Sequence, residues 1–155
     1  MGIYIMKKIL LVASSLLLST QVHAAPGCKA SDLNGNYVMY QAAINKNFHT
    51  GRCEIQILNG NATGTCEFDP AVDGSHNFHG PVSGPAVINT NCSATLELDF
   101  HPNPSIPEFT IVSNFNLQFT PDKQSFIGKF VNSFDVQGTT SGTRYSPLLP
   151  ATPAL

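Results

Sequence analysis

The sequence predicts an all-β fold, a small antiparallel barrel or sandwich of seven to eight strands that is held together by disulfides. Three observations support this prediction. Apolar and polar residues alternate with a period of two in several segments, and clusters of Gly, Pro and Asn separate those segments. No segment beyond residue 24 has convincing helical periodicity, and the chain contains four cysteines. A barrel leaves no exposed strand edge, so we favour it over the sandwich.

The first 24 residues have the features of a secretory signal peptide. Lys7 and Lys8 form a basic region, and Ile9 to Leu18 is an apolar stretch too short to span a bilayer. The sequence Val-His-Ala at residues 22–24 fits a signal-peptidase site, so cleavage is expected after residue 24. Cys28 lies too far from the apolar stretch for a lipoprotein anchor. We therefore expect an exported chain, periplasmic or secreted, with no membrane anchor.

The rest of the chain divides into a single all-β domain, residues 25–146, and a Pro-rich C-terminal tail, residues 147–155. A domain of this length can bury about two-thirds of the surface of its unfolded chain, which is enough for a hydrophobic core. With residues 1–24 removed, the chain has six basic and ten acidic residues, a formal net charge of −4. Nucleic acids and anionic membranes need a basic surface, so neither is expected as a partner.

The four cysteines, Cys28, Cys53, Cys66 and Cys92, all follow the expected signal peptide. An even number of cysteines in an exported chain is typical of disulfides. The alternative is a zinc site, but such sites usually contain a Cys-x-x-Cys pair and this chain has none. We therefore expect two disulfides.

The pair Asn59-Gly60 selects one pairing of these cysteines, because it is the strongest two-residue hairpin signal. A turn there fixes the register of the two flanking strands, and Cys53 then lies opposite Cys66. The alternation places both on the apolar face of the hairpin, within disulfide reach of each other. Elimination leaves Cys28 to pair with Cys92.

The same alternation predicts further strands at residues 34–44, 92–100, 108–119 and 125–138. A four-residue loop between the last two strands makes apolar residues meet across the hairpin. The predicted pairs are Phe119 with Phe126, Phe115 with Phe130, Ile111 with Phe134, and Phe109 with Val136. Residues 69–86 are rich in Gly and Pro and are expected to form a long loop, with residues 85–90 as an optional extra strand.

This register also places Ser113 opposite Asn132 on an otherwise apolar face. The two side chains either hydrogen-bond to each other or act as polar contacts in a ligand cavity, since such cavities are mostly apolar with a few polar groups. The candidate ligand-binding residues are Ser113, Asn132, Phe115, Phe130 and Phe134.

Patterns for catalysis and metal binding are sparse. The chain has no Gly-x-Ser-x-Gly or Ser-x-x-Lys motif, and its strand carboxylates are expected to face outward, so neither an enzyme activity nor a cofactor is expected. His49, His76 and His79 would share one end of a barrel and are the candidates for a metal site. The alternative, which we favour, is that they are solvated loop residues.

The segments Leu33-x-Gly35-x-Tyr37 and Cys-Glu-Ile-Gln-Ile at 53–57 resemble calycin-type barrels, in particular the small secreted bacterial metalloproteinase inhibitors. The resemblance covers about 25 residues, and that family has Trp where this chain has Tyr37. It implies a barrel whose preceding segment, here Ala25 to Ser31, enters a protease cleft. Cys28 is expected to tie this segment down.

These observations favour an exported binding protein that holds a small apolar ligand in the barrel interior. The alternative is a protein-binding module, such as a secreted protease inhibitor, with an extracytoplasmic protein as its partner. The identity of the ligand or partner and the oligomeric state do not follow from the sequence.

Overall fold

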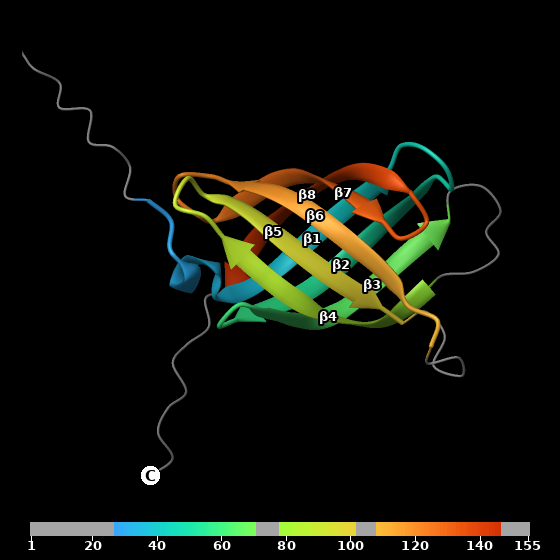
Figure 1. Ribbon diagram of the computed structural model, residues 1–155, viewed down its shortest axis with the longest axis horizontal. Coiled ribbons are helices and arrows are strands. Elements are labelled where there is room, and N and C mark those ends of the chain that lie inside the picture. Colours follow the sequence, from blue (N-terminus) through green and yellow to red (C-terminus); the bar gives the residue numbers. More distant parts are fainter. Residues whose placement is uncertain (1–26, 71–77, 102–107, 147–155) are drawn as a thin grey trace, which may run out of the picture.

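The computed structural model describes residues 27–70, 78–101 and 108–146. These residues form a closed antiparallel barrel of eight strands in sequential order, in which β1 closes the ring by pairing with β8 (Figure 1). The predicted fold class is therefore confirmed, with the barrel rather than the sandwich. The elements are η1 (Ala30–Leu33), β1 (Gly35–Ala43), β2 (His49–Leu58), β3 (Asn61–Pro70), β4 (Phe78–Ile88), β5 (Ser93–Phe100), β6 (Ile111–Phe119), β7 (Ser125–Asn132) and β8 (Gln137–Ser146).

Two predicted segments, the signal peptide at 1–24 and the tail at 147–155, lie outside the described residues. Within the described ranges, no helix is long and apolar enough to cross a membrane. Because the signal peptide lies outside the described residues, export of the chain stays a prediction.

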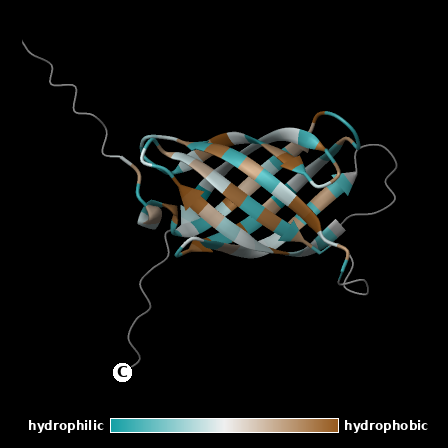
Figure 2. Cartoon of the chain, in the orientation of Figure 1, coloured by the Kyte–Doolittle hydropathy of each residue, from teal (hydrophilic) through white to brown (hydrophobic). Residues whose placement is uncertain are grey.

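Hydrophobic and hydrophilic residues alternate along the strands (Figure 2), and the buried hydrophobic residues form one core inside the barrel. In β2, for example, Cys53, Ile55 and Ile57 are buried while Glu54 and Gln56 are exposed. Successive side chains of a strand point to opposite faces, so every second residue of each strand fills the barrel interior.

Both predicted disulfides are present. Cys53–Cys66 joins directly opposed residues of β2 and β3 inside the barrel, with Cα atoms 4.1 Å apart. Cys28–Cys92 joins the segment before η1 to the turn between β4 and β5, with Cα atoms 5.0 Å apart. In the chain-entropy model, links across sequence separations of 13 and 64 residues stabilise the fold by about 3 and about 4 kcal/mol.

The register predicted for β6 and β7 is confirmed from the Ser113–Asn132 pair to the end of the hairpin. The two outermost predicted pairs, which involve Phe134 and Val136, are wrong, because the expected strand 125–138 ends at Asn132. The Asn132 side-chain oxygen accepts hydrogen bonds from the backbone N–H groups of Phe134 (2.9 Å) and Val136 (3.0 Å). These bonds stabilise a tight turn, which reverses the chain into β8.

Strand β4 corrects the prediction of a long loop over residues 69–86, since residues 78–88 pair with both β3 and β5. Proline lacks a backbone N–H and glycine weakens a strand, which is why this segment resembles a loop in sequence. Pro81 and Pro85 are exposed on the outer face. Gly84 permits a close approach of backbones, because a Cβ built there would lie 2.1 Å from the carbonyl oxygen of Glu97.

Helix η1 covers one end of the barrel and is held there by contacts with Tyr37 of β1, which is fully buried. The Tyr37 hydroxyl donates a hydrogen bond to the Leu33 carbonyl oxygen (2.8 Å) and accepts one from Arg144 Nε (3.2 Å) of β8. The Arg144 guanidinium also lies over the Tyr37 ring, with Cζ 5.2 Å from its centroid, and donates to the Asp32 carbonyl oxygen. Burial raises the pKa of Tyr37, so its hydroxyl stays protonated at neutral pH.

Three hairpin turns also hold η1 in place. Lys123 Nζ, in the β6–β7 turn, lies 2.8 Å from Asp32 Oδ2, and its hydrogen bond lowers the pKa of that carboxyl group. In the β2–β3 turn, the Asn59 backbone N–H donates to Asn34 Oδ1 (2.9 Å). The disulfide of Cys28 supplies the third link, to the β4–β5 turn. Together with Arg144 these contacts close this end of the barrel.

Candidate ligand-binding site

The end of the barrel opposite η1 holds a cavity of about 150 Å³. It is formed where β1, β3, β5 and β7 end and where β2 and β6 begin, together with the β7–β8 turn. Its lining residues are Gln41, Asn47, His49, Phe68, Phe100, Ile111, Ser113, Phe130, Asn132, Phe134 and Val136. An eight-stranded barrel is just wide enough to be filled by side chains or to hold one small ligand.

Aromatic rings form much of the cavity wall. The Phe68 ring packs edge-on against Phe100, with centroids 5.0 Å apart, and against His49 at 5.7 Å. Gly51 lies directly opposite Phe68, and a Cβ there would be 2.4 Å from the Phe68 ring, so the absent side chain provides the space for that ring. The rings supply a large and rigid apolar surface.

Gln41 is the most deeply buried polar residue of the lining, with only 6% of its surface exposed. Its Oε1 atom has no hydrogen-bond partner among the described residues. The neighbouring strands explain this: Gly51 on one side has no side chain, and the hydroxyl of Thr140 on the other donates to the Tyr40 carbonyl oxygen (2.8 Å). A buried acceptor is therefore left unsatisfied at the cavity.

Ser113 and Asn132 are opposed in register, as predicted, but within the described residues no hydrogen bond joins their side chains. The Asn132 oxygen is instead engaged by the β7–β8 turn. The Ser113 hydroxyl has no hydrogen-bond partner in the described part of the chain, so it can donate to or accept from a molecule in the cavity.

His49 has a defined orientation, because its Nδ1–H donates to the Asn47 carbonyl oxygen at 2.8 Å. In the neutral ring, Nε2 is then an acceptor. His79 is exposed on β4, and His76 lies outside the described residues. The described residues contain no group of three or more His, Cys, Asp or Glu that could hold a metal ion.

The structure brings most of the predicted ligand-binding residues together. Ser113, Phe130, Asn132 and Phe134 line the cavity, whereas Phe115 lies deeper in the core and packs against Phe130 with centroids 5.6 Å apart. Phe134 reaches the cavity from the β7–β8 turn rather than from a strand. Whether these residues bind a ligand remains a prediction.

Six lining residues were missing from the predicted site: Gln41, Asn47, Phe68, Phe100, Ile111 and Val136. A signal for Gln41 was present, since it follows Tyr37 and Met39 at a spacing of two and therefore lies on the same face of β1. Phe100 ends the predicted strand 92–100, but it could not be placed at one end of the barrel, because the position of this strand in the barrel depends on its pairing with β4.

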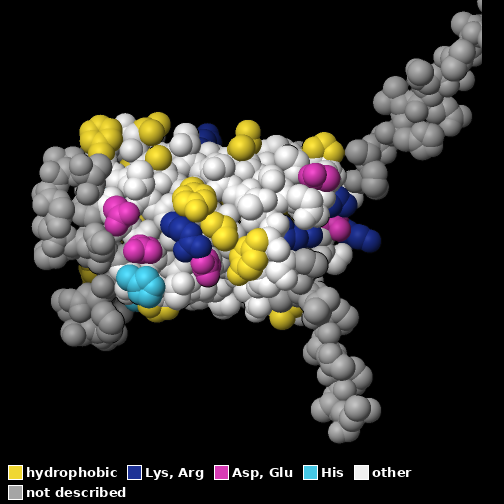
Figure 3. Space-filling model, turned by 180° about the vertical axis from the view of Figure 1, so that it is seen from behind, with side chains coloured by type: hydrophobic (Ala, Val, Ile, Leu, Met, Phe, Trp, Pro, Cys, Tyr) yellow, Lys and Arg dark blue, Asp and Glu magenta, His cyan; other side chains and the backbone are white. Residues whose placement is uncertain are grey.

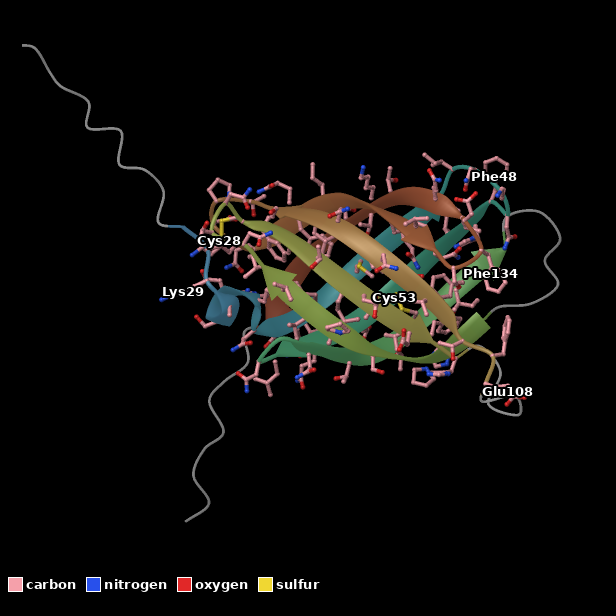
Figure 4. The ribbon with its side chains drawn as sticks, viewed as in Figure 1. Cys28, Lys29, Phe48, Cys53, Glu108 and Phe134 are labelled. Atoms are coloured by element: carbon pink, nitrogen blue, oxygen red, sulfur yellow. A yellow bond between two sulfur atoms is a disulfide. The ribbon has the colours of Figure 1, made fainter. Side chains whose placement is uncertain are left out.

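The rim around the cavity carries exposed apolar side chains. Phe48 precedes β2 and is 54% exposed, and Phe134 in the β7–β8 turn is 53% exposed. Figure 4 shows both at the end of the barrel opposite Cys28 and Lys29. Ile44 and Phe109 flank the same end and are also exposed, and the rings of Phe109 and Phe134 lie 6.1 Å apart.

A larger hollow, of about 1120 Å³, is lined mostly by outward-facing side chains such as Tyr40, Arg52 and Lys129. It lies on the outer surface of the barrel. On the face shown in Figure 3, the basic side chains of the described residues are interspersed with acidic and apolar ones and form no continuous basic patch.

The fold and the cavity together define a closed eight-stranded antiparallel β-barrel that is sealed at one end and hollow at the other. No protein-family model matches the chain, and no curated protein matches it. The likeness to other proteins therefore comes from solved structures.

One similar structure is a de novo designed fluorescence-activating β-barrel, with 14% identity over 74% of this chain and 95% of that chain and a TM-score of 0.50. Another is the redesigned β-barrel mFAP1, bound to DFHBI, with 15% identity over 76% of this chain and 99% of that chain and a TM-score of 0.51. A likeness at such low identity shows the fold alone. It agrees coarsely with the calycin-type resemblance and does not extend to the metalloproteinase inhibitors.

Proposed function

We propose that the chain is an exported protein that binds a small apolar ligand in the hollow end of its barrel. The observation that carries this proposal is the cavity of about 150 Å³ among the aromatic rings of Phe68, Phe100 and Phe130. Ligand sites are typically concave and mostly apolar, with a few polar groups that orient the ligand. Gln41 and Ser113 supply such groups here.

Two further observations support the proposal. The two disulfides fit an oxidising compartment outside the cytoplasm, as expected for an exported chain. A designed barrel of similar fold is bound to DFHBI, so the architecture is compatible with an enclosed ligand.

Native mass spectrometry of the protein purified from its own host tests the proposal. We expect a fraction of the protein to carry a non-covalent adduct of small mass. A protein that carries no adduct, and that takes up no apolar compound offered in excess, would contradict ligand binding.

A blocking substitution locates the site. Ser113→Phe adds a ring to the cavity lining, so we expect it to abolish the adduct while the barrel still folds. Asn114→Phe is the matched control, because the neighbouring residue is exposed on the outer face of the same strand. Retention of the adduct by Ser113→Phe would place the ligand elsewhere.

The alternative is a protein-binding module, such as a secreted protease inhibitor, and the apolar rim with Phe48 and Phe134 favours protein binding. In this case the rim would carry the contact rather than the cavity. The double variant Phe48→Ser with Phe109→Ser, which leaves the cavity lining intact, would then abolish binding of the partner, and Ser113→Phe would not. Pull-down from the extracytoplasmic fraction with the double variant, Ser113→Phe and the control Asn114→Phe in parallel separates the two functions.

A further inference from the structure

We propose that the ligand is a neutral, single-ring aromatic compound whose O–H or N–H group donates a hydrogen bond to Gln41 Oε1. This inference rests on the proposed function, which it makes specific by naming the chemical class of the ligand. Size, charge and hydrogen bonding of the cavity each contribute one step of the argument.

The size of the cavity limits the ligand to a single aromatic ring. An engineered apolar cavity of about 150 Å³ in another protein binds benzene, and the cavity here has about the same volume. The walls are the rings of Phe68, Phe100 and Phe130, which favour a flat ligand because aromatic rings pack against one another at their faces and edges.

The scarcity of charged side chains in the lining favours a neutral ligand. Among the described lining residues there is no Asp, Glu, Lys or Arg. A charged group buried without a counter-charge is strongly disfavoured, so the bound molecule is neutral.

The unsatisfied acceptor, Gln41 Oε1, determines which polar group the ligand should carry. Gln41 Oε1 is buried and has no partner in the described part of the chain, since Gly51 and Thr140 beside it offer no free donor. A ligand without a donor would leave this oxygen unsatisfied, which costs about tenfold in affinity relative to a ligand that pairs with it. A ligand with a donor pairs with it and avoids this cost.

Isothermal titration calorimetry with phenol and fluorobenzene tests the inference, because the two compounds have similar size and only phenol carries a donor. The proteins are the wild type, Gln41→Met, and Gln56→Met as the control for the same substitution on an exposed strand position. We expect Gln41→Met to weaken phenol binding about tenfold and to leave fluorobenzene binding unchanged or tighter. Gln56→Met should bind both compounds as the wild type does.

A measurement on the wild type alone covers the case in which Gln41→Met fails to fold. Phenol should shift the side-chain amide signals of Gln41 in a ¹H–¹⁵N spectrum, and fluorobenzene should shift them less. Equal responses, or an unchanged preference for phenol in Gln41→Met, would overturn the role of Gln41 and leave the proposed function standing. Failure of both compounds to bind the wild type would overturn the proposed function as well.

Discussion

Tyr37 links the core of the barrel to its sealed end through a single hydroxyl group. That group donates to the Leu33 carbonyl oxygen of η1 and accepts hydrogen bonds from Arg144 of β8 at 3.2 and 2.6 Å. The contacts bring together the first strand, the last strand and the helix that precedes the barrel. Loss of the hydroxyl would remove hydrogen bonds from the Leu33 carbonyl oxygen and from the Arg144 guanidinium, which is more costly at a buried site than at an exposed one.

We therefore expect Tyr37→Phe to lower the free energy of unfolding by about 1–3 kcal/mol, because the Leu33 carbonyl loses one hydrogen bond and the Arg144 guanidinium loses two. Urea denaturation measures the change as a lower midpoint with an unchanged slope. Tyr145→Phe is the control, since Tyr145 lies on β8 next to Arg144 and is 58% exposed. Its substitution should change stability by less than about 0.5 kcal/mol. Equal stability of Tyr37→Phe and the wild type would contradict this role.

Single residues differ in how far the sequence reveals their roles. The pairing of Cys53 with Cys66 could be predicted, because a two-residue turn at Asn59-Gly60 fixes the register of the flanking strands. The contact of Arg144 with Tyr37 could not, because the two residues are 107 positions apart and meet only when the barrel closes. Gln41 could be placed on an inner face, but its lack of a partner depends on neighbours on two other strands.

At the scale of the elements, inward glycines opposite aromatic residues recur along the barrel wall. Gly142 of β8 lies opposite Phe126 of β7, and a Cβ built on it would be 2.3 Å from the Phe126 ring. Gly138 and Phe130 form a second such pair on the same two strands, with a built Cβ 2.4 Å from the ring. Each ring covers the glycine across from it, so the pairs let large rings fill a narrow interior.

The substitution Gly142→Ala should therefore destabilise the barrel, because the added methyl group would force the Phe126 ring from its position. We expect a loss of about 1–3 kcal/mol, the usual cost of overpacking a core. Ser141→Ala, on the exposed outer face beside it, should change stability by less than about 0.5 kcal/mol. Thermal unfolding of the two variants gives the comparison, and similar midpoints would contradict close packing at Gly142.

The elements themselves were predictable where alternation is strong, as in β2, β5 and β6. Most of strand β4 was missed, apart from its end within the optional strand at 85–90, because its prolines and glycines are typical of loops and its assignment depends on the two strands between which it lies. The boundary between β7 and β8 was missed because Phe134 and Val136 continue the apolar alternation through the turn. In β8 itself the inward residues include Gly138, Thr140 and Gly142, which give no apolar signal.

The whole molecule has two different ends. The η1 end is closed by Arg144, by the Lys123–Asp32 ion pair and by the disulfide between Cys28 and Cys92. The other end has a cavity and an apolar rim. A closed end and a hollow end are consistent with the proposal that a ligand binds at one end.

A barrel could be predicted from the sequence, because closure leaves no strand edge unpaired. The difference between the two ends of the barrel could not be predicted. It depends on the tilt and stagger of eight strands, which no local pattern contains. The candidate site was therefore predicted in part, through the β6–β7 register, and the rest of its lining required the closed barrel.

The central claim is that a small ligand binds at the open end. A ¹H–¹⁵N chemical-shift map of the disulfide-bonded chain titrated with toluene tests it most directly. We expect the shifts to cluster at Gln41, His49, Ser113 and Asn132, while Asn34 and Lys123 at the sealed end stay unchanged. Shifts concentrated at the sealed end or spread over the outer surface, or none at saturation, would contradict the claim.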